Sequence, residues 1–328
     1  MYYENHPIKS NLKSKRIKWK EPYGPIAWCA MKEMREHNDT RKIYDVNPYI
    51  EVYQFRDNLY SLYVENADGM QDVWLHLIVG PEKAMLIDTG YGIGDTKALV
   101  DQLTDGKPLI VANTHNHCDH AYGNCRFEQV YCHEYDVPKL QAQNEHIWDY
   151  LFDENGDCIW LDFDKADLPQ FKQYEIIGLK DGHVFNLGED YEVELIHMGG
   201  HTPGMSGYLD RKNRIFFAGD DVSAQRVAVG GLKAPEGMLY GECATLPFFT
   251  SRLKVLADRL DEFDFIFPGH LILDLESHII LSMLATCEKI LAEDYYQYTT
   301  VKRPPNMAPR LLYNTFVDDV GSRIGYTK

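Results

Sequence analysis

The sequence predicts a layered α+β protein in which two sheets are flanked by helices. Two strand-rich parts of the chain, each with its own helical segments, lead to this prediction, and an aromatic stretch without a regular period separates them. Strands and helices of this kind must bury an apolar face against another element. Two sheets packed face to face under outer helices meet that requirement.

Length and charge limit the class of protein. The chain has 328 residues, 45% of them hydrophobic, with 33 Lys and Arg against 50 Asp and Glu and a formal net charge of −17. This length fits one large domain or two small ones. A general nucleic-acid binder needs a basic surface, so we expect no nucleic-acid partner.

Neither export nor membrane insertion is indicated. No stretch approaches the roughly 20 apolar residues of a membrane span, and residues 1–22 lack the apolar core of a signal peptide. The 7 cysteines are odd in number and irregularly spaced, which favours reduced thiols. We therefore expect a cytoplasmic protein without a membrane partner.

Residues 1–49 show no clear period and are interpreted as an N-terminal extension, wrapped on the domain or on a partner subunit of a homodimer. Within it, residues 9–20 carry six basic residues and no acid. We interpret this run as a solvated arm on an acidic body rather than as a nucleic-acid or membrane contact.

Strand patterns begin at residue 50. Two hairpins are predicted from the strands at residues 50–55, 59–64, 73–79 and 84–87. Asp95 can cap a helix over residues 96–103. The apolar, β-branched run 109–112 then predicts a buried parallel strand.

Alternating strands and helices continue to the end of the expected catalytic domain, residues 50–296. Strands are predicted at residues 129–132, 184–186, 191–196, 206–209, 214–218 and 264–267, and helices at residues 134–143, 248–260 and 275–293. Residues 221–247 are expected to form a loop. The C-terminal tail, residues 297–328, is expected to be irregular, with Pro304, Pro305 and Pro309.

Residues 144–174, the aromatic insertion, are acidic and aromatic without a sustained period. A long irregular stretch in a compact domain is usually functional or disordered, and this many aromatic residues argue against disorder. We expect a lid or pocket wall rather than a purely structural subdomain. Trp148 and Trp160 are then candidate substrate contacts, and the substrate is partly apolar or ring-bearing.

A histidine cluster follows the strand at residues 109–112. His115, His117, Asp119 and His120 leave its carboxyl end, where open α/β sheets place their sites. Zinc, iron and manganese all accept imidazole and carboxylate ligands. The H-x-H-x-D-H spacing is too crowded for one tetrahedral metal, but it suits two adjacent metals, with the first two histidines on one and Asp119 and His120 on the other.

Three other strand ends carry a ligand-type residue beside glycine. These are His201 in G-G-H-T-P-G, Asp220 in A-G-D-D and His270 in F-P-G-H. Glycine lets the backbone turn sharply and brings the next side chain close to a site. Any one of these motifs is a weak signal, whereas four strand ends that all offer His or Asp form a strong one.

With these motifs in this order, residues 50–293 resemble the metallo-β-lactamase superfamily. The resemblance implies an αβ/βα sandwich of two sheets with two divalent metal ions at one edge, zinc first and iron or manganese as alternatives. His115, His117 and His201 would hold the first metal, and Asp119, His120 and His270 the second. Asp220 would bridge them, and Asp88 would support the cluster loop through hydrogen bonds.

Paired metals of this kind predict a hydrolase. Metal coordination lowers the pKa of water to about 7 for zinc, so a bridging hydroxide is available as nucleophile at neutral pH. Asp119 is placed to orient that water or to take its proton, and Asp220 is the second catalytic carboxylate. We expect a hydrolase of a small organic ester, lactone, thioester or amide. A phosphodiesterase on the same site and a non-catalytic metal-binding regulatory protein are the alternatives.

Substrate contacts are expected from the loop after Asp220. Tyr240, Arg226 and Lys233 are its candidates, and the substrate is expected to be a small molecule with aromatic or anionic character. The ligand-bearing loops at residues 114–124, 197–209 and 267–273 contain no Lys or Arg. Phosphoryl-transfer sites usually add such bases beside the metals, so this absence favours ester-type chemistry.

Overall fold

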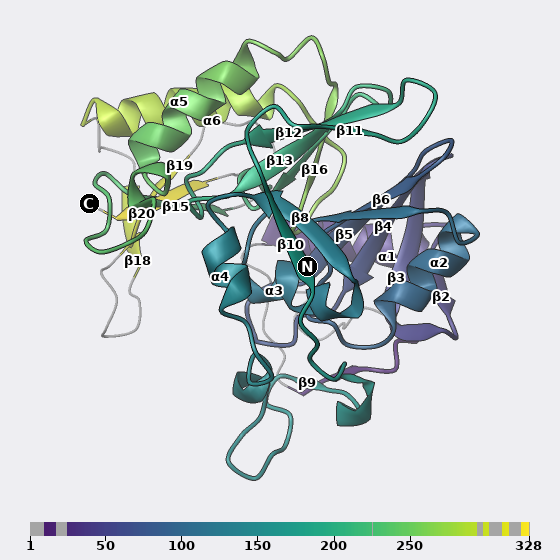
Figure 1. Ribbon diagram of the computed structural model, residues 1–328. Coiled ribbons are helices and arrows are strands. Elements are labelled where there is room, and N and C mark those ends of the chain that lie inside the picture. Colours follow the sequence, from purple (N-terminus) through teal and green to yellow (C-terminus); the bar gives the residue numbers. More distant parts are fainter. Residues whose placement is uncertain are drawn as a thin grey trace. The chain divides into compact units, whose positions relative to one another are not determined.

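The structure, a computed structural model, describes residues 10–17, 25–224, 226–293, 298–301, 310–314 and 323–327. The chain separates into two compact units (Figure 1). The first consists of Met1–Cys132, Val137–Gly178 and Asn186–Glu192, and the second of His133–Asp136, Leu179–Phe185 and Val193–Lys328. Within the described part of the chain, no helix is long and apolar enough to cross a membrane.

The first unit is built on an eight-stranded sheet of order β10-β8-β7-β6-β5-β4-β3-β2. Its strands are β2 (Lys42–Tyr44), β3 (Asn47–Arg56), β4 (Leu59–Val64), β5 (Val73–Val79), β6 (Ala84–Ile87), β7 (Leu109–Ala112), β8 (Gln129–His133) and β10 (Glu175–Leu179). β6, β7 and β8 run parallel, with Ile87 opposite Ala112. Asp88 and the residues after Ala112 therefore leave the sheet at the same edge.

Helix α2 (Thr96–Thr104) follows the predicted pattern. Asp95 Oδ1 accepts a hydrogen bond from the Ala98 backbone N–H at 3.0 Å, which caps the helix start. Leu99 and Val100 are fully buried in the core of this unit. Two shorter helices, α3 (Cys118–Ala121) and α4 (Val137–Gln141), flank β8, so the helix expected over residues 134–143 is shorter than predicted.

The N-terminal residues are more regular than expected. They contain β1 (Lys15–Arg16) and α1 (Pro25–His37) before β2 joins the main sheet. Arg35 of α1 is buried, and its Nε lies 2.8 Å from Glu51 Oε2 of β3. This buried ion pair and the pairing of β2 with β3 attach the N-terminal segment to the sheet. The hydrophobic pattern of such short elements does not predict these contacts.

The interpretation of the basic run as a solvated arm is wrong for Arg16, which is half-buried, whereas Lys13 stays exposed although it pairs with an acid. Lys13 Nζ lies 2.5 Å from Asp167, and Arg16 lies 2.6 Å from Asp72. Both acids are distant in sequence from the basic run, so the sequence pattern did not predict these ion pairs. The lysines at positions 9, 18 and 20 lie outside the described residues.

The aromatic insertion is irregular, as predicted. Its regular elements are η2 (Asp149–Leu151), β9 (Leu161–Asp162) and η3 (Lys165–Asp167), and β9 pairs with β1. Four of its residues, Trp148, Leu151, Leu161 and Phe163, are buried among the apolar residues of the first unit.

The second unit is built on a six-stranded sheet of order β11-β12-β13-β14-β16-β17. Its strands are β11 (Val184–Asn186), β12 (Glu192–His197), β13 (Ser206–Asp210), β14 (Ile215–Gly219), β16 (Phe265–Pro268) and β17 (Leu275–Glu276). β14 and β16 run parallel, with Gly219 opposite Pro268. The residues that follow these two strands, Asp220 and His270 among them, therefore leave the sheet at one edge.

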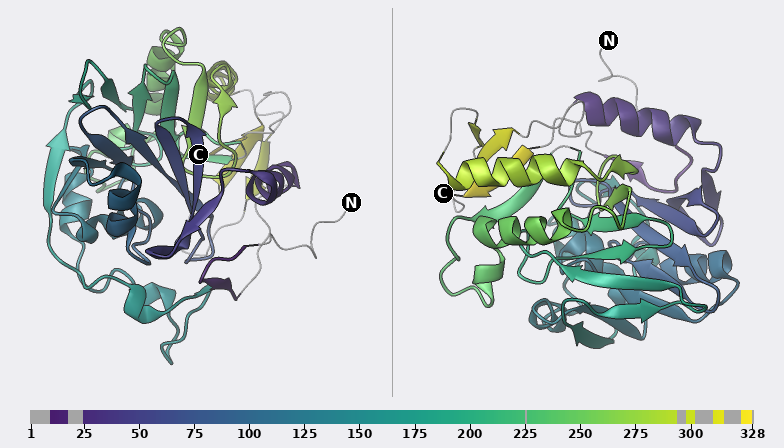
Figure 2. Two further views of the ribbon diagram at one scale, coloured as in Figure 1. Left: turned by 90° about the vertical axis from the view of Figure 1, so that its right-hand side faces the viewer. Right: turned by 90° about the horizontal axis from the view of Figure 1, so that it is seen from above.

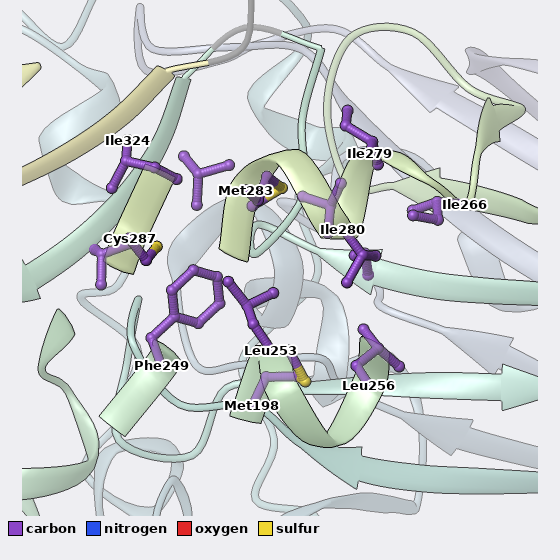
Figure 3. Close-up of a cluster of buried hydrophobic side chains, with 14 of the residues drawn as sticks. Met198, Phe249, Leu253, Leu256, Ile266, Ile279, Ile280, Met283, Cys287 and Ile324 are labelled. Carbon is purple, nitrogen blue, oxygen red and sulfur yellow. The ribbon is translucent and has the colours of Figure 1, made fainter. Parts of the chain in front are cut away.

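Two helices, α5 (Leu246–Ala257) and α6 (Ile279–Leu291), lie side by side in the second unit (Figures 1 and 2). Figure 3 shows Phe249, Leu253 and Met283 from these helices pointing into one apolar cluster. Thr245 caps α5 by accepting a hydrogen bond from the Phe248 N–H at 3.3 Å. α6 begins four residues later than predicted because residues 275–276 form β17.

A four-stranded sheet of order β15-β20-β19-β18 corrects two predictions. The expected loop after Asp220 contains β15 (Arg226–Gly231), and the expected irregular tail contains β18 (Tyr298–Val301), β19 (Arg310–Asn314) and β20 (Arg323–Thr327). β15 pairs with β20, nearly 100 positions later in the chain. Short strands with such distant partners carry little signal in a local pattern.

Candidate metal centre

Four candidate ligands converge in the first unit, in the stretch that runs from the end of β7 into α3. His115 Nε2 lies 2.9 Å from His117 Nδ1, and the rings of His115 and His120 are 4.2 Å apart. Asp119 Oδ2 lies 3.6 Å from His120 Nε2. Because His115 and His120 are fully buried, their ring nitrogens are held in a fixed arrangement.

Asp88 holds the backbone and one ring of the histidine cluster through hydrogen bonds. Asp88 Oδ1 accepts a hydrogen bond from Thr114 N at 2.7 Å, and Oδ2 accepts from Thr114 Oγ1 and from His120 Nδ1, both at 2.8 Å. Its φ of 64° lies in the left-handed region, so the carboxylate is aimed by an uncommon backbone conformation. Since His120 Nδ1 carries the donated proton, Nε2 is the nitrogen with a lone pair for a metal.

A buried amide network, which was not predicted from the sequence, also holds this loop. Asn113 Nδ2 donates to the His120 carbonyl at 3.1 Å, and Asn124 Nδ2 donates to Asn113 Oδ1 at 2.7 Å. Thr89 Oγ1 donates to Asn124 Oδ1 at 2.8 Å. A Cβ on Gly123 would lie 2.2 Å from the Thr89 carbonyl oxygen, so only glycine fits there. The sequence did offer a signal for this network, because Asn113 directly follows the apolar strand and Asn124 lies shortly after the histidine motif.

Three candidate ligands converge in the second unit, where Asp220 lies between two imidazoles. Asp220 Oδ2 lies 3.2 Å from His201 Nε2, and Oδ1 lies 3.1 Å from His270 Nε2. His201 Nδ1 donates to the Ala228 carbonyl at 2.7 Å. The two carboxylate oxygens thus face two different rings, as a bridging ligand requires.

The neighbouring carboxyl group, Asp221, has a different environment. Its side chain is fully buried. Burial first, and then the negative charge of Asp220, raise the pKa of Asp221 well above its ordinary value. Ionisation of the Asp221 carboxyl group is therefore less favourable than that of an ordinary aspartate.

The donor chemistry of both units fits divalent metal ions. Ligating histidines usually donate their second ring N–H to a carboxylate or a carbonyl, as His120 does to Asp88 and His201 does to Ala228. Imidazole nitrogens and carboxylate oxygens suit zinc, iron or manganese. Among the described residues, the candidate metal ligands are His115, His117, Asp119, His120, His201, Asp220 and His270.

The aromatic insertion contributes one exposed ring near the cluster. Tyr150 is 44% exposed, its ring lies 6.4 Å from that of Tyr122, and its hydroxyl interacts with the Cys118 thiol. Trp148 is instead a core residue whose indole N–H donates to the Tyr91 carbonyl at 2.8 Å. Its burial does not support the prediction that Trp148 contacts substrate.

The other candidate substrate contacts have clear positions in their own units. Trp160 packs over Gly69, where a Cβ would lie 2.6 Å from the indole ring. Arg226 begins β15, opposite Arg323 of β20. Tyr240 has a φ of 56° and stacks on Tyr135, with ring centroids 4.2 Å apart. A role for any of them in substrate binding stays a prediction.

Two stacked histidines form a further feature of the second unit. The rings of His133 and His197 are 3.8 Å apart and nearly parallel, at 11°. Burial, and then the proximity of His197 and Arg252, lower the pKa of His133 to about 3. Burial also lowers the pKa of His197. Both rings are therefore neutral at neutral pH.

This pair predicts a pH dependence of stability. An unfolded histidine titrates near pH 6.5, whereas folded His133 has a pKa of about 3, so the unfolded chain binds more protons between these two pH values. Its contribution to stability is present above pH 6.5 and is lost as the pH falls toward 3. In urea denaturation from pH 6 to 4, the free energy of unfolding of wild type should fall more steeply with falling pH than that of His133→Phe. The difference in slope should correspond to the uptake of up to about one proton on unfolding. An unchanged slope contradicts this, and the exposed His146→Phe is the control.

Comparison with known proteins places the chain in a family. The sequence profile of the metallo-beta-lactamase superfamily matches residues 69–270, more than half of the chain and every candidate ligand. The chain belongs to the metallo-beta-lactamase superfamily. The resemblance drawn from the H-x-H-x-D-H cluster and its companion motifs is thereby confirmed. Membership and the ligand sets imply divalent metals and support a metal-dependent hydrolase.

Two similar curated proteins carry the same name. Acyl-coenzyme A thioesterase MBLAC2 of Homo sapiens is 28% identical over 167 residues, and that of Bos taurus is 27% identical over 168 residues. Each alignment covers 46% of this chain. The chain thus spans 58% of the length of these relatives.

A solved structure supports the fold class. The metallo-beta-lactamase from Pontibacter korlensis matches with a TM-score of 0.50 at 16% sequence identity, covering 73% of this chain and 99% of that one. The predicted metallo-β-lactamase-like α+β fold, with mixed sheets flanked by helices, is confirmed.

Proposed function

We propose that this protein is a binuclear metal-dependent hydrolase of a small acyl substrate, with a thioester as the first candidate. The observation that carries the proposal is Asp220, which directs one carboxylate oxygen to His201 and the other to His270. His115, His117 and His201 would hold the first ion, and Asp119, His120 and His270 the second, with Asp220 shared. Zinc is the preferred metal for this nitrogen-rich set, and iron and manganese are the alternatives.

Two divalent ions held by these residues would supply Lewis-acid polarisation of the acyl carbonyl and would lower the pKa of water, so that hydroxide would be available near neutral pH. The chain contributes orientation and proton handling. Asp88 holds His120 in one tautomer, and the Ala228 carbonyl does the same for His201. Asp119, which is partly exposed beside His120, can accept the proton of the attacking water on a carboxylate oxygen.

Thioester chemistry is favoured by the relatives and by the ligand loops. The curated relatives are named acyl-coenzyme A thioesterases, although the chain spans only 58% of their length. The ligand-bearing loops at residues 114–124, 197–209 and 267–273 lack Lys and Arg, whereas phosphoryl transfer usually recruits such bases, and only the loop after Asp220 contains them. Acyl transfer needs a single oxyanion donor, for which Tyr240 or a backbone amide is the candidate. Tyr150 is the aromatic residue of the insertion that we propose contacts the substrate.

A substrate panel tests the proposal. The purified chain, loaded with zinc, should hydrolyse short acyl-coenzyme A thioesters faster than a lactone, a p-nitrophenyl ester or bis-p-nitrophenyl phosphate. A chelator should abolish the activity and added metal should restore it. Faster hydrolysis of the phosphodiester would reverse our preference. Full metal loading with no hydrolysis of any substrate would favour the non-catalytic alternative.

Four further features are part of the proposal. We propose residues 50–296 as the catalytic domain, a cytoplasmic location, a small-molecule substrate, and the absence of a nucleic-acid partner, which the net charge of −17 supports. A homodimer formed through the N-terminal residues is the oligomer to test first.

A further inference from the structure

The loop that carries His201, residues 198–205, is closed at its neck by backbone hydrogen bonds. The N–H groups of Met198 and Gly199 both donate to the Met205 carbonyl at 2.9 Å. Gly200 N donates to the Cys243 carbonyl at 2.8 Å. This His201 loop therefore has a fixed base, and the orientation of His201 depends on what holds residues 202–204.

Asp136, from the turn between β8 and α4, lies against the tip of the His201 loop. It is 1% exposed. Its Oδ1 accepts a hydrogen bond from Gly204 N at 3.1 Å, and its Oδ2 lies 3.5 Å from Thr202 Oγ1. A Cβ on Gly204 would lie 2.6 Å from the Asp136 carboxyl carbon, so this close approach needs glycine. One buried carboxylate thus contacts the residues on both sides of Pro203.

His197 holds the residue in between. Its Nε2 lies 2.7 Å from the Pro203 carbonyl oxygen, to which it donates. The ring of His133 stacks against the ring of His197, and Arg252 Nε donates to the His197 carbonyl at 2.6 Å. Each of the residues 201–204 is therefore held by a separate contact, and His201 itself is held by the Ala228 carbonyl.

We propose that Asp136, supported by His197, is a positioning residue that sets the orientation of His201 and with it the metal affinity of the site. The inference rests on the ligand role proposed for His201. Without the Asp136 carboxylate, the Gly204 N–H loses its buried acceptor and Thr202 loses a buried contact. Leaving a buried donor unpaired is unfavourable, so the loop tip would relax and move the imidazole. Asp136 thus holds the loop of a candidate ligand in the second unit through hydrogen bonds, as Asp88 does in the first unit.

The test measures zinc affinity by competition with a chromogenic chelator, on purified full-length chains whose folding is checked by circular dichroism. Asp136→Ala should weaken the affinity for one of two ions by 10- to 100-fold, as is typical when a partner of a ligand is lost. Asp136→Asn keeps an acceptor for Gly204 N and should restore affinity to within several-fold of wild type. Thr202→Val removes one contact without changing side-chain size and should give a smaller loss than Asp136→Ala.

Asp210→Ala is the matched control for a merely structural role. Asp210 is a fully buried acid of the same unit that accepts hydrogen bonds from Lys212 N and Asn213 N, both at 3.0 Å, in the turn after β13. It should lower the melting temperature without changing zinc affinity. If Asp136→Ala behaves in the same way, the positioning role is refuted while the proposed function stands. A wild-type chain that binds no metal would overturn both.

Discussion

Substitution of Asp220 by alanine is expected to remove most of the activity and at least one of two bound metal ions while the chain stays folded. Asp220 is the carboxylate that faces both His201 and His270, at 3.2 and 3.1 Å. Without it, the candidate ligand set would have one carboxylate fewer to hold two divalent ions, so the affinity for both ions should fall. We expect the catalytic rate to fall roughly 10³-fold, and elemental analysis with circular dichroism checks metal content and folding.

The exposed acid Asp261 provides the control for that substitution, because Asp261→Ala removes the same group from the surface of the same unit. It should leave metal content and rate unchanged. An Asp220→Ala variant with full activity would refute the bridging assignment. Loss of structure in Asp220→Ala before metal is added would make Asp220 a folding residue instead.

Asp88→Asn is expected to lower the affinity for the ion at His120 by 10- to 100-fold with only a small loss of stability. Asparagine tolerates the φ of 64° at this position and keeps one acceptor for Thr114 N. Its amide, however, places a donor where Oδ2 accepts from His120 Nδ1. The His120 ring would then carry its proton on Nε2, which blocks the metal-binding nitrogen.

Asp88→Gly separates the effect of the backbone conformation at this position from the effect of the side-chain hydrogen bonds. It keeps the backbone conformation but leaves the donors of Thr114 and His120 unpaired in a buried site, so unfolding free energy should fall by roughly 3 kcal/mol. Asp105→Asn, at an exposed helix end with a φ of 52°, is the matched control and should change neither the free energy of unfolding nor the metal affinity. Asp88→Asn with unchanged metal affinity would contradict the tautomer argument.

Local patterns predicted most of the two main sheets. β4, β5, β6 and β7 were predicted with the bounds that the structure shows, because alternating or continuous apolar runs bounded by turns specify such strands locally. The sheet formed by β15, β18, β19 and β20 was missed. Its strands are short and their partners are far apart in sequence, so no local period marks them.

The same contrast holds for the candidate site. The candidate ligands lie in short motifs at strand ends, where the sheet topology alone brings them to one edge of each sheet. Asp136 forms a hydrogen bond with a residue 68 positions away, and its local sequence does not indicate that partner. Asn113 and Asn124 bond to each other over only 11 positions, and their places beside the strand and the histidine motif were the available signal. The aromatic insertion was predicted to face a pocket. Several of its apolar side chains are instead buried in the core of the first unit, and a buried side chain is not available to contact a substrate.

The central claim is that the seven candidate ligands hold two metal ions in one chain. Its most direct test is the metal stoichiometry of the purified protein, measured by elemental analysis after expression with supplemental zinc and removal of free metal. We predict about two ions per chain for wild type and about one or fewer for both His117→Ala, from the first unit, and His270→Ala, from the second. A folded wild-type chain without bound metal, or a stoichiometry that neither substitution changes, would contradict the account.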